Sequence, residues 1–197
     1  TVGGRMEMEA GTGNDAGNNS TDGTTSDVWD ETSMYVSGSF GKIQIGNNDP
    51  AASYVGSVKG VGPVGIVKSD ASKWFGMSGK ETIDNDNDAG MGDDQKITYF
   101  SPKMGAMSFA VSYQPDDSEG TLDDRDKNQT DGVKDGVSAM VKYAGKAGKA
   151  KYSVAAGYSQ VDSSGNTKDG WNVGMVVSQG ATTFAAFTQE EDDGTGK

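Results

Sequence analysis

The residues best suited to ligand chemistry form an acidic run in the middle of the chain. Within it, Asp84, Asp86 and Asp88 stand at alternate positions with asparagines between them. Oxygen ligands at alternate positions begin the calcium-binding loop of helix–loop–helix proteins. The match is incomplete, since Ala89 stands where that loop needs glycine and Gln95 where it needs a bidentate glutamate. A calcium ion on these three aspartates and a solvated acidic run are therefore both open interpretations.

The sequence offers little to support catalysis. It contains no histidine and no cysteine, which removes the commonest general base, thiol nucleophiles and the usual zinc ligands. Neighbouring carboxylates such as Asp93 and Asp94 match the acid–base pair of a glycosidase only in residue type. Nothing in the sequence indicates an apolar setting that would raise the pKa of either carboxyl group. We therefore expect no enzymatic activity and no required cofactor.

Composition excludes further classes of protein. The 197 residues carry a formal net charge of -12, which argues against a nucleic-acid partner because phosphates would be repelled. There are 30 glycines and a single leucine, Leu122, so a helical core is not expected. No apolar run approaches the roughly 18 residues that a membrane-spanning helix needs.

The elements that must position the charged residues are strands. In 106–114, large apolar residues alternate with small or polar ones, which is the period of a strand with one apolar and one polar face. Similar alternation predicts about nine strands, at 4–10, 28–37, 42–46, 96–101, 106–114, 137–143, 151–160, 171–178 and 181–189. The facing of 28–37 stays open, because Trp29 and Tyr35 share one parity whereas Met34 and Val36 share the other.

The connections between these strands fall into two kinds. Short glycine-containing turns are expected at 38–41, 102–105, 145–148 and 179–180. Long polar loops are expected at 11–27, 47–94, 115–135, 162–170 and from 190 onward. If short and long connections alternate strictly in an antiparallel sheet, all the turns lie at one rim and all the loops at the other. The segment 47–94 is far longer than an ordinary connection, which is typical of a functional loop.

Aromatic residues cluster near the predicted strand ends. Such clustering is typical of the girdles of outer-membrane barrels, although ordinary strand propensity is an alternative. The residues concerned are Tyr99, Tyr113, Tyr143, Tyr152, Tyr158 and Trp171.

Two hairpins resemble a known family. The segments YVSGSFGKIQIGNNDPA at 35–51 and ITYFSPKMGAMSFAVSYQPD at 97–116 are similar to general porins of the Gram-negative outer membrane, closest to the alphaproteobacterial type. The resemblance implies an all-β fold, a transmembrane antiparallel up-and-down β-barrel of the 16-stranded porin type. Residues 1–197 would form one partial barrel domain covering about the third to eleventh strands, so we expect a fragment of the protein. The alphaproteobacterial resemblance also implies a homotrimer with short periplasmic turns and long outer loops.

The resemblance further implies a role for 47–94 as an infolded constriction loop. Its acidic residues would face basic wall residues across the pore and create a transverse field that filters ions. The candidate loop residues are Asp49, Asp70, Glu81, Asp84, Asp86, Asp88, Asp93 and Asp94. The candidate wall residues are Arg5, Lys42, Gln44, Lys142 and Lys151. Because Arg5 shares its face with Glu7 and Glu9, and the chain has only one other arginine, we expect a mild cation preference.

Two functions from different classes follow. The first is an outer-membrane porin, a water-filled channel for passive diffusion of small hydrophilic solutes and ions, in contact with lipid and lipopolysaccharide. The alternative is a secreted soluble β-sandwich or β-roll that binds carbohydrate or calcium. The arrangement of the apolar faces distinguishes them, because a sandwich presses those faces together between two sheets.

Overall fold

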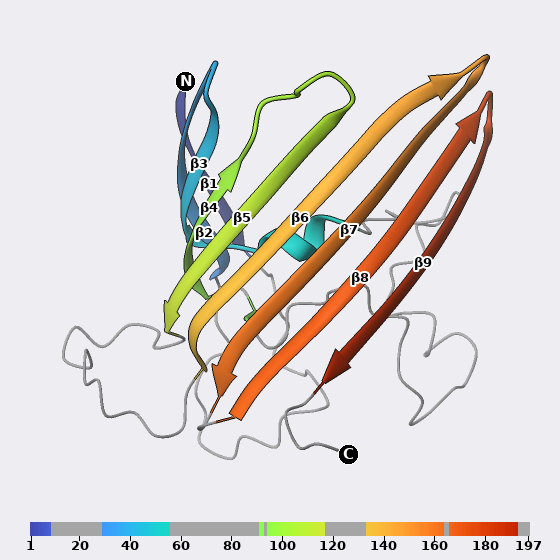
Figure 1. Cartoon of the computed structure of the whole chain (residues 1–197). Helices are drawn as coiled ribbons and strands as arrows, with labels where there is room; N and C mark the ends of the chain where they lie inside the picture. Colours follow the sequence, from blue (N-terminus) through green and yellow to red (C-terminus); the bar gives the residue numbers. More distant parts are fainter. Residues whose placement is uncertain (9–28, 56–90, 93, 117–132, 164–165, 193–197) are drawn as a thin grey trace.

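The computed structural model describes residues 1–8, 29–55, 91–92, 94–116, 133–163 and 166–192. These residues form one antiparallel sheet of nine strands in chain order, with β1 and β9 at its edges (Figure 1). The strands are β1 (Val2–Met8), β2 (Trp29–Gly38), β3 (Gly41–Asn47), β4 (Gln95–Phe100), β5 (Met107–Asp116), β6 (Val133–Ala147), β7 (Ala150–Ser163), β8 (Asn166–Gln179) and β9 (Thr182–Asp192). The all-β antiparallel architecture is therefore as predicted.

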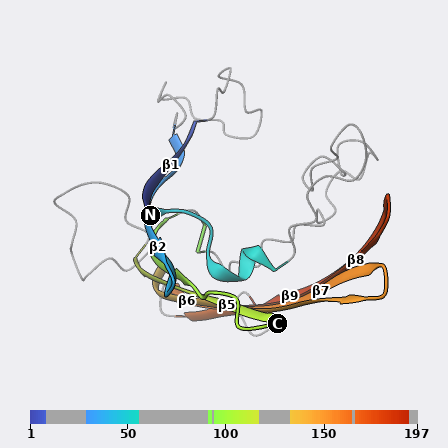
Figure 2. The same cartoon turned by 90° about the horizontal axis from the view of Figure 1, so that it is seen from above.

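The sheet is curved, and a short 3-10 helix, η1 (Ala51–Tyr54), lies on its concave side (Figure 2). The connections 38–41, 100–107, 147–150 and 179–182 lie at the upper end of the strands in Figure 1, which we call the short-turn rim. The other ends of the strands form the opposite rim. The two rims follow from antiparallel order, and the four predicted short turns lie at one of them as expected.

Alternation sorts the side chains onto two unlike faces. On the concave face, hydroxyl residues pair across neighbouring strands, with Thr98 opposite Ser112 and Ser112 opposite Ser138. On the convex face, large apolar residues do the same, with Val111 opposite Tyr99 and Phe109 opposite Val141. The concave face is thus polar and the convex face apolar.

The pairing of β2 with β1 and β3 shows which of its side chains lie on the convex face and which on the concave face. Met34 pairs with Ile45 and lies on the convex face, 69% exposed. Tyr35 lies on the concave face and covers Gly3, where a Cβ atom would come within 2.5 Å of the tyrosine ring. Sequence parity alone left this choice open, since β2 carries bulky residues on both faces.

The prediction of a polar loop at 162–170 is wrong. Strands β7 and β8 continue through it, and the last pair in their register is Ser163 with Asn166. The Thr167 hydroxyl donates to Asp162 across the two strands at 3.2 Å. Polar residues extend this hairpin beyond its apolar band, so the alternation that marks a strand is lost although the pairing continues. Short and long connections consequently do not alternate strictly.

Candidate functional site

The chain leaves the sheet after β3 and crosses the concave face. The backbone N–H groups of Ala51 and Ala52 donate to the hydroxyls of Ser112 on β5 and Ser138 on β6, at 2.9 and 2.8 Å. The Asn172 side chain on β8 donates to the Ala52 carbonyl at 3.1 Å. The segment 48–55 is therefore hydrogen-bonded to strands far from the one it leaves.

A row of small polar side chains forms the seat for this segment. Thr98 and Ser112 share a hydrogen bond of 2.8 Å, and Ser159 donates to Ser138 at 2.9 Å. All four of these side chains are fully buried. Short hydroxyls suit the position because they bond the passing backbone without holding it away from the sheet.

Gly157 on β7 completes the seat. A Cβ atom there would lie 2.4 Å from Asn172 Oδ1, 2.8 Å from Val55 and 2.9 Å from Ala52. Only glycine leaves room for η1 to approach the sheet this closely. Sequence reasoning missed these residues, although Ser112, Ser138 and Ser159 stand on the polar parity of three neighbouring strands, which was a signal.

The chain leaves β3 through residues 48–55, the departing stem, and returns to β4 through residues 91–92 and 94, the returning stem. The returning stem also contacts the sheet. Met91 is fully buried and reaches Gly136, where a Cβ atom would lie 3.1 Å from the methionine methyl group. The Gln114 side chain donates to the Asp94 carboxylate at 3.0 Å. Lys96, at the start of β4, donates to backbone carbonyls of both stems. Sequence reasoning assigned none of these contacts.

The candidate wall residues all fall on the concave parity of their strands. Those residues are Arg5, Lys42, Gln44, Lys142 and Lys151. Lys142 lies opposite Ser108 on β5, and Lys151 lies opposite Lys146 beside the short-turn rim. The structure does not test their predicted role in ion selection, which stays a prediction.

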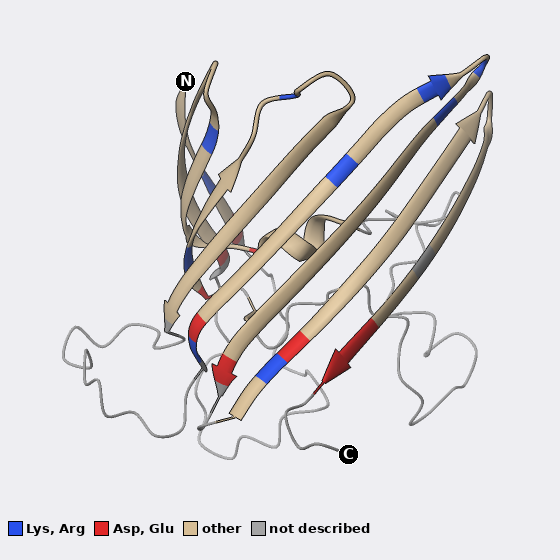
Figure 3. Ribbon diagram, viewed as in Figure 1, with Lys and Arg blue, Asp and Glu red and all other residues tan. Residues whose placement is uncertain are grey.

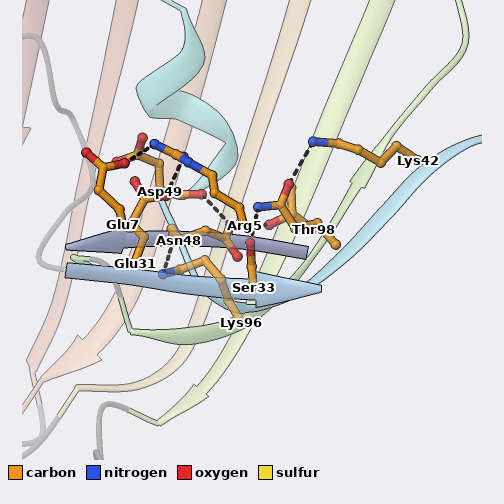
Figure 4. Close-up of polar contacts among 10 residues, drawn as sticks. Arg5, Glu7, Glu31, Ser33, Lys42, Asn48, Asp49, Lys96 and Thr98 are labelled. Atoms are coloured by element: carbon orange, nitrogen blue, oxygen red, sulfur yellow. Dashed lines mark hydrogen bonds and ion pairs between the residues drawn. The ribbon is translucent and has the colours of Figure 1, made fainter. Parts of the chain in front are cut away.

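Arg5 is held between two carboxylates (Figure 4). It forms ion pairs with Glu7 on its own strand and with Glu31 on β2. The Glu31 side chain is only 8% exposed, whereas that of Arg5 is 49% exposed. The cluster of one arginine and two glutamates is therefore a partly buried group with an excess of negative charge.

Lys42 lies farther along the same face. Its ammonium donates to Gln44 Oε1 at 2.7 Å, and Gln44 in turn donates to the Ser33 hydroxyl at 2.9 Å (Figure 4). The Lys42 nitrogen also lies 4.0 Å from the centre of the Phe100 ring, close enough for a cation–π contact. Lys42 thus places its ammonium group on the polar face, between Gln44 and the Phe100 ring.

The acidic candidates divide into two groups. Asp49 lies within segment 48–55, and Asp94 lies where the chain returns to β4. The others lie outside the described residues, and these are Asp70, Glu81, Asp84, Asp86, Asp88 and Asp93. The calcium interpretation of Asp84, Asp86 and Asp88 therefore stays a prediction. Within the described ranges, no three His, Cys, Asp or Glu side chains gather as metal ligands would.

The aromatic candidates all lie on the convex parity. They are Tyr99, Tyr113, Tyr143, Tyr152, Tyr158 and Trp171. Tyr143 and Tyr152 stack near the short-turn rim, with ring centres 6.1 Å apart. Tyr158 pairs with Trp171 in the half of the sheet nearer the opposite rim, and Tyr113 lies toward the same rim on β5. Their convex position is compatible with two aromatic bands, and the aromatic girdle itself stays a prediction.

In the part of the chain that the structure describes, no helix has the length and apolar character needed to cross a membrane.

Comparison with known proteins agrees with this geometry. The sequence model of a family described as Gram-negative porin matches residues 1–197, the whole chain. A solved structure of a porin, refined at 1.8 Å resolution, matches with a TM-score of 0.50 and 19% sequence identity. The match covers 81% of this chain and 48% of that porin, so the chain spans about half the length of the porin it resembles. No curated protein matches the chain.

Proposed function

Because the chain belongs to the family of Gram-negative porins, we propose that it forms part of the wall of a water-filled channel in the outer membrane. Small hydrophilic solutes and ions would diffuse through it passively. The proposal rests on a distribution of side chains opposite to that of a water-soluble protein. Large apolar side chains are exposed on the convex face, and polar side chains are buried on the concave one.

The energetics of the convex face require an apolar surrounding. Met34, Val141 and Val173 are 69%, 43% and 38% exposed, and many other large apolar side chains share their face. Full burial of one such side chain is worth roughly 1.5–3 kcal/mol, and the exposed part of each forgoes the corresponding fraction in water. Contact with lipid hydrocarbon recovers that free energy, and the two proposed aromatic bands would lie where a bilayer has its interfaces.

The concave face suits water. Arg5, Lys42 and Lys142 lie on it, and segment 48–55 covers part of it. We assign 47–94 as the constriction loop because both its stems are bonded to this face. The charge of Arg5 is offset by its two glutamates, so the positive wall depends on the lysines. This balance supports a mild cation preference.

The sheet has two edges, and an unpaired edge is not stable in hydrocarbon. We therefore propose that it is part of a larger closed barrel of the 16-stranded type. We further propose assembly as a homotrimer, with lipid and lipopolysaccharide around the convex face. The alternative, a soluble sandwich, lacks support because the described strands form one sheet with its apolar face uncovered.

The proposal is tested on the protein that carries this chain, extracted from outer membranes and added to a planar bilayer. We expect extraction to need detergent, a heat-sensitive trimer on a gel, and stepwise increases in conductance. A protein released by salt alone, with no conductance after reconstitution, would contradict the channel and favour the soluble alternative.

A further inference from the structure

Lys96 is a buried lysine with an unusual set of partners. It lies on the concave parity of β4, opposite Gly46, and is 2% exposed. Its ammonium donates to three backbone carbonyl oxygens, those of Asn48 at 2.5 Å, Asp94 at 2.7 Å and Gly92 at 2.9 Å. Figure 4 shows the side chain reaching toward Asn48.

This arrangement matches the chemistry of an ammonium group. A lysine has three N–H donors, and burying it is unfavourable unless those donors are bonded. Three converging carbonyl oxygens meet that requirement. The site is therefore built for a cation, and the lysine side chain supplies that cation itself.

The three carbonyls belong to two different stems. Asn48 lies where the chain leaves β3, whereas Gly92 and Asp94 lie where it returns to β4. Both stems are also fixed to the sheet, since Asn48 donates to Thr98 and Gln114 donates to Asp94. The ammonium thus joins the two ends of a long connection, since Lys96 lies 48 positions after Asn48.

We propose that Lys96 is a positioning residue for permeation. Its ammonium fixes where the constriction loop departs from the wall and where it rejoins it. The width and steadiness of the pore then depend on a lysine that never meets the solute. The inference rests on the proposed function, because it assigns the residue that holds the proposed constriction in place.

The test compares Lys96→Met with Lys142→Met in the trimer. Both variants remove one ammonium from the same face, but only the first removes the link between the stems. We expect Lys96→Met to raise open-channel current noise in bilayers. Proteolytic cleavage within 47–94 should also become roughly tenfold faster, which corresponds to about 1.4 kcal/mol of lost anchoring. The proposal would be overturned if Lys96→Met has the cleavage rate and the current noise of the unaltered protein. It would also be overturned if both quantities change equally in the two variants.

A second measurement needs no substitution. A buried, fully bonded amine resists acylation, so an amine-reactive ester should modify Lys149 and Lys142 in the folded trimer and spare Lys96. Modification of Lys96 at the rate of Lys142 would overturn the proposal, and this result decides the matter if Lys96→Met does not assemble. Both the cleavage and the acylation are measured in detergent. If the unaltered protein shows no conductance, that result would therefore contradict the proposed channel and not the proposed role of Lys96.

Discussion

Ser138 shows how one hydroxyl can hold a loop. It accepts hydrogen bonds from the Ala52 backbone and from the Ser159 hydroxyl, and it is fully buried. Ser138→Ala leaves the buried Ala52 N–H without this acceptor, which costs about 1–3 kcal/mol. We expect urea-induced unfolding of the reconstituted protein to show a loss of that size. Ser108→Ala, on the same face, is the control, and equal losses in the two variants would count against the seat for η1.

The cluster around Arg5 predicts signed changes in ion selectivity. Arg5 with Glu7 and Glu31 carries an excess negative charge, so removing the arginine should increase cation preference. Glu31→Gln should lower cation preference, because it leaves Arg5 with one carboxylate. Reversal potentials in a salt gradient measure both, and shifts of the same sign in Arg5→Gln and Glu31→Gln would contradict the assignment of this cluster to the pore wall.

At the scale of the elements, Val141 tests which face meets lipid. It lies on the convex face near the middle of β6 and is 43% exposed. Val141→Lys should destabilise the protein in lipid bilayers by about 2–4 kcal/mol, the cost of a cation near the bilayer midplane. Ala144→Lys, on the concave parity of the same strand, should cost much less. Equal unfolding free energies for the two variants would contradict the contact of the convex face with lipid hydrocarbon.

Strands and their facing were largely predictable because they depend on local alternation. The apolar residues of 106–114 and 137–143 mark one face without any knowledge of their partners. The hairpin of β7 and β8 was missed at its tip, since polar residues such as Asp162 and Thr167 suit a loop and a solvated strand equally. There, cross-strand pairing decides the structure, and a single strand's pattern does not contain it.

The seat for η1 and the link that Lys96 makes between the two stems were not predictable for a different reason. Lys96 reads as a polar residue of a strand, and its role depends on Asn48, which lies 48 positions earlier. Ser138 and Asn172 likewise act on Ala52, 86 and 120 positions away. Such roles follow from the folding of one segment across the sheet, which requires the register of every strand beneath it.

At the scale of the whole molecule, charge differs between the two rims (Figure 3). Lysines gather at the short-turn rim, where Lys103, Lys142, Lys146 and Lys151 line a common hollow. Carboxylates predominate toward the opposite rim, on the ends of β7, β8 and β9, where they outnumber Lys168. In the proposed pore these rims would form an acidic mouth, to which Glu191 contributes from the concave parity, and a basic mouth, with an axial field between them.

This polarity predicts rectification at low salt. One sign of voltage drives cations in through the acidic mouth and anions in through the basic mouth, which adds carriers of both kinds to the pore. The current should therefore be larger at that sign than at the opposite sign. The effect should vanish near 1 M salt, where the Debye length falls to about 3 Å. Single-sided insertion into a planar bilayer at 0.01 M, with a screening length of about 30 Å, measures the current ratio. Lys146→Gln combined with Lys151→Gln should bring the ratio toward one. A symmetric current–voltage curve at low salt in the unaltered protein would show that the charges of the rims do not reach the path of the ions.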